Sequence, residues 1–141
     1  MMSGIRGKDT KPEMILRRGL HRLGFRYHLH RRDLPGTPDL VFPKHRAVIL
    51  AQGCFWHCHE CHLFKWPTSQ ADFWREKISG NKLRDEANNQ RLRKSGWRVL
   101  TVWECALKGP GRLGIDLVIE RAADWIVSDS SSGEVRGIDG R

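Results

Sequence analysis

The chain has 141 residues, a hydrophobic content of 39% and six tryptophans, which suits one folded domain with a single core. No apolar run approaches membrane-spanning length, and the first six residues lack the apolar stretch of a signal peptide. A formal net charge of +9 points to a polyanionic partner, and the basic residues cluster among aromatic ones. We therefore expect a cytoplasmic, nucleoid-associated protein that binds nucleic acid and has no membrane partner.

The first predicted element is a helix that begins after Thr10. Thr10 suits the N-cap, Pro12 the first turn, and Glu13 the third position of a capping box. Gly24 ends the helical pattern, whose members are Ile15, Leu16, Gly19, Leu20 and Leu23.

Short strands are predicted next. Residues 25–29 alternate like a strand, and residues 34–38 form a bend rich in Pro and Gly. Short apolar strands follow at 39–42 and 47–51, joined by a turn at 43–46.

The second half of the chain begins with a loop that runs to about Ser69. A helix is predicted over 71–96, broken near Gly80-Asn81, then a strand over 97–103 and an amphipathic helix over 117–127. Residues from Ser128 are rich in Ser and Gly, and we expect a flexible tail there, outside a single domain of residues 1–127. This order of elements predicts an α/β sandwich around a mixed sheet.

The loop carries the densest chemistry of the chain. Residues 53–62 hold three of the four cysteines and three of the seven histidines. Thiolates and imidazoles at such close spacing suit a tetrahedral zinc site, and reduced cytoplasmic cysteines favour metal binding over disulfides. Spacing alone favours an all-cysteine site, made of Cys54, Cys58, Cys61 and Cys105.

Two further residue types suit a nuclease. Asp39 lies at the start of a strand after a sharp bend, where a carboxylate is a good ligand for a hard metal, or alternatively caps the turn. His57 supplies an imidazole, a side chain that serves as a general base in many enzymes. With Glu13 on the first helix, this arrangement resembles the core of the PD-(D/E)xK nuclease fold.

A more specific resemblance extends nearly to Trp125. The chain resembles the very short patch repair endonucleases in motifs that occur in order: Pro35-Gly36-Thr37-Pro38-Asp39, Gly53-Cys54-Phe55-Trp56-His57, Phe73-Trp74-Arg75-Glu76-Lys77-Ile78, Asn81 with Arg84-Asp85, Gly96-Trp97-Arg98-Val99-Leu100 and Val102-Trp103-Glu104-Cys105. The resemblance implies a restriction-endonuclease-like fold and a magnesium-dependent nick. It also implies the substrate, a thymine–guanine mismatch produced by deamination of 5-methylcytosine and cut on the 5′ side of the thymine.

The resemblance assigns roles to individual residues. Asp39 matches the aspartate that binds magnesium, and Ala51 a position whose backbone carbonyl ligates the same ion. His57 matches a histidine that acts as general base or stabilises charge, while Glu13 and Asp85 match supporting acidic residues.

One catalytic position departs from the family. Relatives often carry a second active-site histidine just before the Gly-Cys step, and this chain has Gln52 there. A glutamine can hydrogen-bond water or phosphate but does not take up a proton near neutral pH, so it either positions a group or lowers activity.

The resemblance also implies the DNA contacts and the zinc ligands. Phe55, Trp56 and Trp74 match aromatic residues that wedge into the duplex. The zinc ligands become Cys54, His59, Cys61 and Cys105, which leaves His57 free for catalysis and places Cys58 at a variable position.

The remaining tryptophans and histidines are interpreted as structural or surface residues. Trp97, Trp103 and Trp125 are expected in the core, and four histidines are expected at the surface or on phosphates: His21, His28, His30 and His45. A monomer is expected, with any contact to mismatch-repair proteins left open. Two alternatives also stay open, namely a homing or restriction nuclease of the same fold and a non-catalytic, zinc-stabilised DNA-binding module.

Overall fold

The centre of the protein is a mixed β-sheet. The computed structural model describes residues 10–57, 59–61 and 63–138, and within them five strands lie in the order β1-β2-β3-β4-β5. The strands are β1 (His28–Leu29), β2 (Leu40–Phe42), β3 (Ala47–Gln52), β4 (Arg98–Trp103) and β5 (Ser132–Val135). The first three strands pair antiparallel, whereas β3–β4 and β4–β5 pair parallel. The prediction of a mixed sheet flanked by helices is confirmed.

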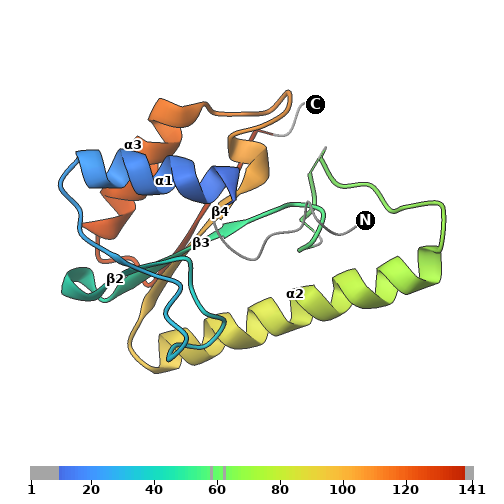
Figure 1. The fold of residues 1–141 in the computed structure, drawn as a ribbon, viewed down its shortest axis with the longest axis horizontal. Helices are drawn as coiled ribbons and strands as arrows, with labels where there is room; N and C mark the ends of the chain where they lie inside the picture. Colours follow the sequence, from blue (N-terminus) through green and yellow to red (C-terminus); the bar gives the residue numbers. More distant parts are fainter. Residues whose placement is uncertain (1–9, 58, 62, 139–141) are drawn as a thin grey trace.

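Helices α1 (Lys11–Arg22) and α3 (Ile115–Ile126) lie side by side on one face of the sheet (Figure 1). Residues at alternate strand positions, such as Leu40 and Phe42, join this core because successive side chains of a strand point to opposite faces. The prediction of Thr10 as the N-cap is confirmed, since the Thr10 hydroxyl accepts the N–H of Glu13 at 3.4 Å.

Helix α2 (Ala71–Lys94) covers the opposite face only near its C-terminal end (Figure 1). There Leu92 packs with Val41, Val48 and Trp97 in a second core cluster. The rest of the 24-residue helix is largely exposed and polar, with Ile78 as its other buried residue. A helix with so little apolar face is held by contacts at its ends and presents most of its surface to solvent.

The predicted break of this helix near Gly80 is wrong, because α2 continues through it from Ala71 to Lys94. A glycine inside a helix costs only about 1 kcal/mol, which the flanking turns offset. Two smaller boundaries also differ from the predictions: β1 is shorter than the predicted strand over 25–29, and α3 begins at Ile115 rather than at residue 117.

The expected tail from Ser128 is also wrong for β5, whose residues pair with β4 from Val99↔Ser132 to Val102↔Val135. The sheet edge supplies backbone hydrogen bonds, so this Ser- and Gly-containing segment needs little apolar surface of its own. Position 133 requires glycine because the backbone of β5 passes close to the Trp125 ring. A Cβ at this position would lie 2.6 Å from Nε1 of Trp125.

Candidate functional site

The predicted site residues gather where β3 and β4 end. Register pairing puts Gln52, the last residue of β3, opposite Trp103, the last residue of β4. From this edge the chain enters the loop of residues 53–70, which extends beyond the sheet toward the N-terminal end of α2 (Figure 1). Parallel strands expose their carboxyl ends together, which is where α/β proteins build their sites.

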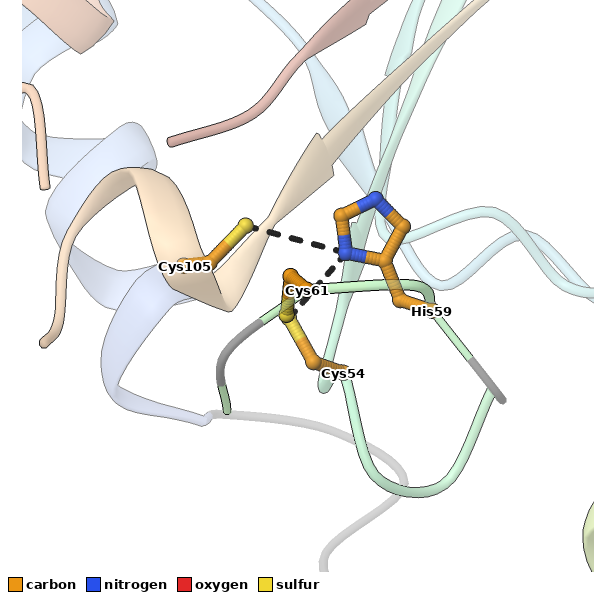
Figure 2. Close-up of side chains that lie close together, drawn as sticks. All are labelled: Cys54, His59, Cys61 and Cys105. Atoms are coloured by element: carbon orange, nitrogen blue, oxygen red, sulfur yellow. Dashed lines mark hydrogen bonds between the residues drawn. The ribbon is translucent and has the colours of Figure 1, made fainter. Parts of the chain in front are cut away.

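Three cysteines and one histidine converge at this edge, as Figure 2 shows. Nδ1 of His59 lies 3.4 Å from Sγ of Cys54 and 3.6 Å from Sγ of Cys105, and all four candidate ligand atoms, including Sγ of Cys61, lie within 4.8 Å of one another. A tetrahedral zinc with ordinary Zn–S and Zn–N bonds separates its sulfur and nitrogen ligands by about 3.5 Å. The cluster therefore fits a structural zinc ion.

The thiols of this cluster are buried. Burial raises the pKa of Cys54 far above the ordinary range, and the neighbouring Cys105 thiol adds to the rise. Burial likewise raises the pKa of Cys105, although the N–H of Gly137, 3.3 Å from its Sγ, opposes the rise. Closely packed buried thiols do not ionise without a cation, so zinc is what would hold them as thiolates.

The ligand set agrees with the one implied by the family resemblance. Cys58, which spacing alone placed among the ligands, lies outside the described residues. The cluster is also supported from both sides: the ring of His59 stacks on Trp103, and the Cys54 N–H donates to Oε1 of Glu104 at 3.2 Å.

Asp39 lies just before β2 and faces the end of β3. The N–H of Ala51 donates to Oδ2 of Asp39 at 2.7 Å, so the carboxylate and the Ala51 peptide are in direct contact. Burial raises the pKa of Asp39 to about 7, with a smaller contribution from the Glu13 carboxylate, while the Ala51 hydrogen bond lowers it. A nearby cation would stabilise the ionised form of such a buried carboxyl group.

Glu13 is almost fully buried and supports this site from α1. Its Oε2 lies 2.7 Å from Nε2 of His30 and 3.5 Å from Nη1 of Arg17. The ligand atoms of Glu13, His30 and Asp39 all lie within 4.8 Å of one another, which suits a divalent cation. The prediction that His30 is a surface or phosphate-contacting group without a partner is therefore wrong.

His57 and Asp85, both predicted as active-site residues, contact each other. Nδ1 of His57 contacts Oδ2 of Asp85 on α2, and both side chains are about one-quarter exposed, at 26% and 25%. Water therefore reaches the pair. The carboxylate fixes the orientation of the imidazole and favours a proton on Nδ1, as in other carboxylate–histidine pairs.

Gln52, the last residue of β3, is almost buried, with an exposed fraction of 9%.

The three predicted DNA-contacting rings also meet. Phe55 and Trp56 lie 4.9 Å apart between ring centroids, and Trp74 of α2 lies 5.7 Å from Phe55 and 5.5 Å from Trp56. Among the described residues, none of these rings belongs to a core cluster, and each is only partly buried. Asn81 fixes the group by donating to the Trp56 carbonyl at 3.0 Å. Trp97 and Trp103 are buried, which confirms their core assignment, whereas Trp125 is only partly buried.

Comparison with known proteins agrees with these observations. Residues 1–63 match the family model described as DNA mismatch endonuclease Vsr. The DNA mismatch endonuclease Vsr of Escherichia coli strain K12 is 42% identical over 134 residues, which cover 95% of this chain and 86% of that protein.

Nicking enzymes are similar to the chain as well. The type II nicking enzyme V.XorIIP of Xanthomonas oryzae pv. oryzae is 47% identical over 113 residues, 80% of this chain and 83% of its own. The type II nicking enzyme V.NmeAIP of Neisseria meningitidis serogroup A is 44% identical over 108 residues, 77% of each chain.

The protein is a DNA endonuclease, a hydrolase with a restriction-endonuclease-like fold. This class is defined by the mixed sheet, the cysteine–histidine and carboxylate–histidine clusters, and the similarity to these enzymes. The chain belongs to the Vsr family of DNA mismatch endonucleases. Within the described part of the chain, no helix is long and apolar enough to cross a membrane.

Proposed function

We propose that this enzyme nicks one strand of duplex DNA on the 5′ side of the thymine in a thymine–guanine mismatch, in a magnesium-dependent reaction that starts very short patch repair. The observation that carries the mismatch assignment is the partly exposed aromatic group of Phe55, Trp56 and Trp74, of which Trp56 directly precedes His57 in the chain. The Escherichia coli relative, whose name is DNA mismatch endonuclease, aligns with 95% of the chain and supports the same assignment.

Asp39 is assigned to the magnesium ion together with the backbone carbonyl of Ala51. The contact between the Ala51 peptide and the Asp39 carboxylate supports this pairing, because it brings the two oxygen donors into one neighbourhood. When bound, magnesium lowers the pKa of water and offsets charge on the phosphate. Asp39 contributes a negative charge, which its raised pKa makes available above about pH 7 or in the presence of a cation.

His57 is assigned as the base that removes a proton from the attacking water. Since Asp85 engages Nδ1, the proton is accepted at Nε2, and the carboxylate stabilises the imidazolium that forms. The partial exposure of the pair supports this role, because an entirely buried histidine is cut off from solvent.

Gln52 is assigned a positioning role. It ends β3 next to Ala51, and its amide can donate to a phosphate oxygen or orient water without exchanging a proton. Proton transfer would therefore fall to His57 alone.

The aromatic group is assigned to opening the duplex at the mismatch. Stacked bases hide their edges, and a mispaired step is cheaper to unstack than a Watson–Crick pair. Rigid rings that already contact one another lose little conformational freedom when they enter the gap. This supports selection of the mispaired site by its ease of opening.

A second function is favoured by the other relatives. V.XorIIP and V.NmeAIP, named type II nicking enzymes, are 47% and 44% identical to this chain. A nicking enzyme that reads a fully paired sequence would use the same hydrolytic residues and would not depend on a weakened base pair.

The deciding experiment is a nicking assay with end-labelled duplexes that differ at one pair. Thymine–guanine, thymine–adenine and cytosine–guanine versions are compared in several sequence contexts, with magnesium and with a chelator. Magnesium-dependent cutting confined to the mismatch, 5′ of the thymine, is the expected result. Equal cutting of paired DNA would favour the second function.

The Asp39→Asn variant is the matched control for catalysis. It keeps the shape of the side chain and loses the charge that attracts magnesium, so it is expected to bind DNA and to nick at least about a hundred-fold more slowly. Full activity in this variant would remove Asp39 from the assignment.

A further inference from the structure

His30 is the residue near the candidate magnesium site that family resemblance did not assign. It directly follows β1, and its N–H donates to the Asp39 carbonyl at 3.2 Å. The backbone of His30 is left-handed, with φ of 48°, a conformation that is uncommon for a residue other than glycine. The fold therefore holds His30 directly opposite Asp39.

The side chain of His30 points into the same site. Its Nε2 lies 2.7 Å from Oε2 of Glu13, a carboxylate with 1% exposure, and the side chain of His30 is itself 19% exposed. The nearest ligand atoms of Glu13, His30 and Asp39 are all within 4.8 Å of one another. Three different segments of the chain, α1, the end of β1 and the start of β2, thus bring two carboxylates and one imidazole together.

The chemistry of this set differs from that of an all-oxygen site. Magnesium prefers carboxylates, carbonyls and water, whereas an imidazole is a better ligand for first-row transition metals, above all iron, nickel, copper and zinc. A site with one nitrogen and several oxygen donors should gain affinity for transition metals relative to magnesium.

We propose that His30 is a side-chain ligand of the divalent cation at Asp39 and Glu13, and that it makes this site bind manganese more tightly than magnesium. The inference rests on the proposed function, since it adds a ligand to the metal site that the reaction requires. The nitrogen donor directly follows β1 and is independent of Gln52 at the end of β3.

The test measures metal binding without DNA. Zinc-loaded, full-length protein is titrated with manganese alone and with magnesium alone by calorimetry. His30→Gln keeps a polar group beside Glu13 and removes the imidazole, and His28→Gln, at an exposed position of β1, is the matched control. Manganese affinity is expected to fall about ten-fold or more in His30→Gln, with magnesium affinity changed far less. Melting temperature and zinc content establish that each variant is folded.

A spectroscopic measurement on the unaltered protein does not depend on how the variants fold. Pulsed electron paramagnetic resonance of the manganese-bound protein is expected to show the hyperfine coupling of an imidazole nitrogen. Absence of that coupling, or equal manganese affinity in His30→Gln and His28→Gln, overturns the assignment of His30.

Asp39→Asn separates this inference from the proposed function. If it loses both metals while His30→Gln loses neither, the metal site stands and His30 is not a ligand. If Asp39→Asn retains both metals, the site itself is wrong, and the proposal for His30 and the assigned role of Asp39 fall together.

Discussion

The imidazole of His59 lies flat on the indole of Trp103, with ring centroids 3.9 Å apart and planes inclined by 6°. The same indole meets the ring of His57 edge-on at 6.3 Å and donates from Nε1 to Glu134 at 3.0 Å. Trp103 therefore joins the zinc ligands, the proposed catalytic histidine and strand β5. If the zinc loop, residues 53–70, is displaced, Trp103 should move with His59 and change the position of His57.

The zinc site gives the first prediction. Purified protein should contain about one zinc per chain, and Cys105→Ser should lose it and unfold at lower temperature, since structural zinc contributes directly to folding. Cys58→Ser is the control and should retain the metal. Metal content by atomic spectroscopy and thermal unfolding check both, and loss of zinc from Cys58→Ser would favour the all-cysteine ligand set instead.

The aromatic group gives the second prediction. Trp56→Ala and Trp74→Ala should each weaken binding to mismatched DNA about ten-fold, because stacking on a base is worth roughly 1–3 kcal/mol. Binding to fully paired DNA, which depends mainly on phosphate contacts, should change much less. Leu83→Ala, at a 67% exposed position of α2, is the control. Equal losses on both duplexes with a lower melting temperature would instead indicate a core role for the rings.

The pKa of Asp39 gives the third prediction. Because burial raises this pKa from its unfolded value of 3.8 to about 7, the folded protein without magnesium binds the proton more tightly than the unfolded chain. The contribution of Asp39 to stability is then greatest below about pH 4, declines as pH rises to about 7, and is constant above that.

Asp39→Asn removes the pH dependence of stability that Asp39 causes and leaves the pH dependence caused by the zinc ligands unchanged. Between pH 5 and pH 8 the unaltered protein should therefore lose on the order of 2 kcal/mol of unfolding free energy relative to Asp39→Asn. This figure allows for the partial exposure of the Asp39 side chain. Chemical unfolding of the zinc-loaded proteins in magnesium-free buffer measures this loss. A difference that stays constant with pH would show that Asp39 is ionised throughout.

Gly137 gives the fourth prediction. A Cβ there would lie 2.3 Å from the Cys105 carbonyl oxygen and 2.8 Å from that of Gly111, and both are backbone atoms that cannot move aside cheaply. Gly137→Ala should displace the N–H from the Cys105 sulfur and weaken zinc retention about ten-fold against a competing chelator. Gly80→Ala, in the middle of α2 with room for a methyl group, should retain zinc fully. Matching chelator resistance in the two variants would count against support by this segment.

Sequence patterns predicted the elements with strong local signals. Thr10 and Pro12 marked the start of α1, and the apolar run of β3 marked a buried strand, because capping chemistry and hydrophobicity are local properties. A zinc site was predictable because cysteines and histidines crowd residues 53–62, but spacing alone favoured four cysteines, and His59 entered the ligand set only through the family resemblance.

Other features depend on contacts between distant segments and left no local trace. His30 joins Glu13 only because β1 and α1 pack near the start of β2, and nothing in its neighbours distinguishes it from His28. Strand β5 was missed because its stability comes from pairing with β4, whereas its own composition is that of a loop. The continuity of α2 through Gly80 likewise reflects the whole helix rather than one residue.

The contact of Gly137 with Cys105 has a consequence for how the protein is made. A ribosome releases Cys54, His59 and Cys61 first, Cys105 after them, and Gly137 later still, while domains fold as units during synthesis. The Arg136 side chain, which donates to the Glu60 carbonyl at 2.7 Å, likewise reaches the loop of residues 53–70 only after β5 has been made. A chain truncated before β5 therefore lacks these contacts and should be recovered as an unstable, zinc-poor protein.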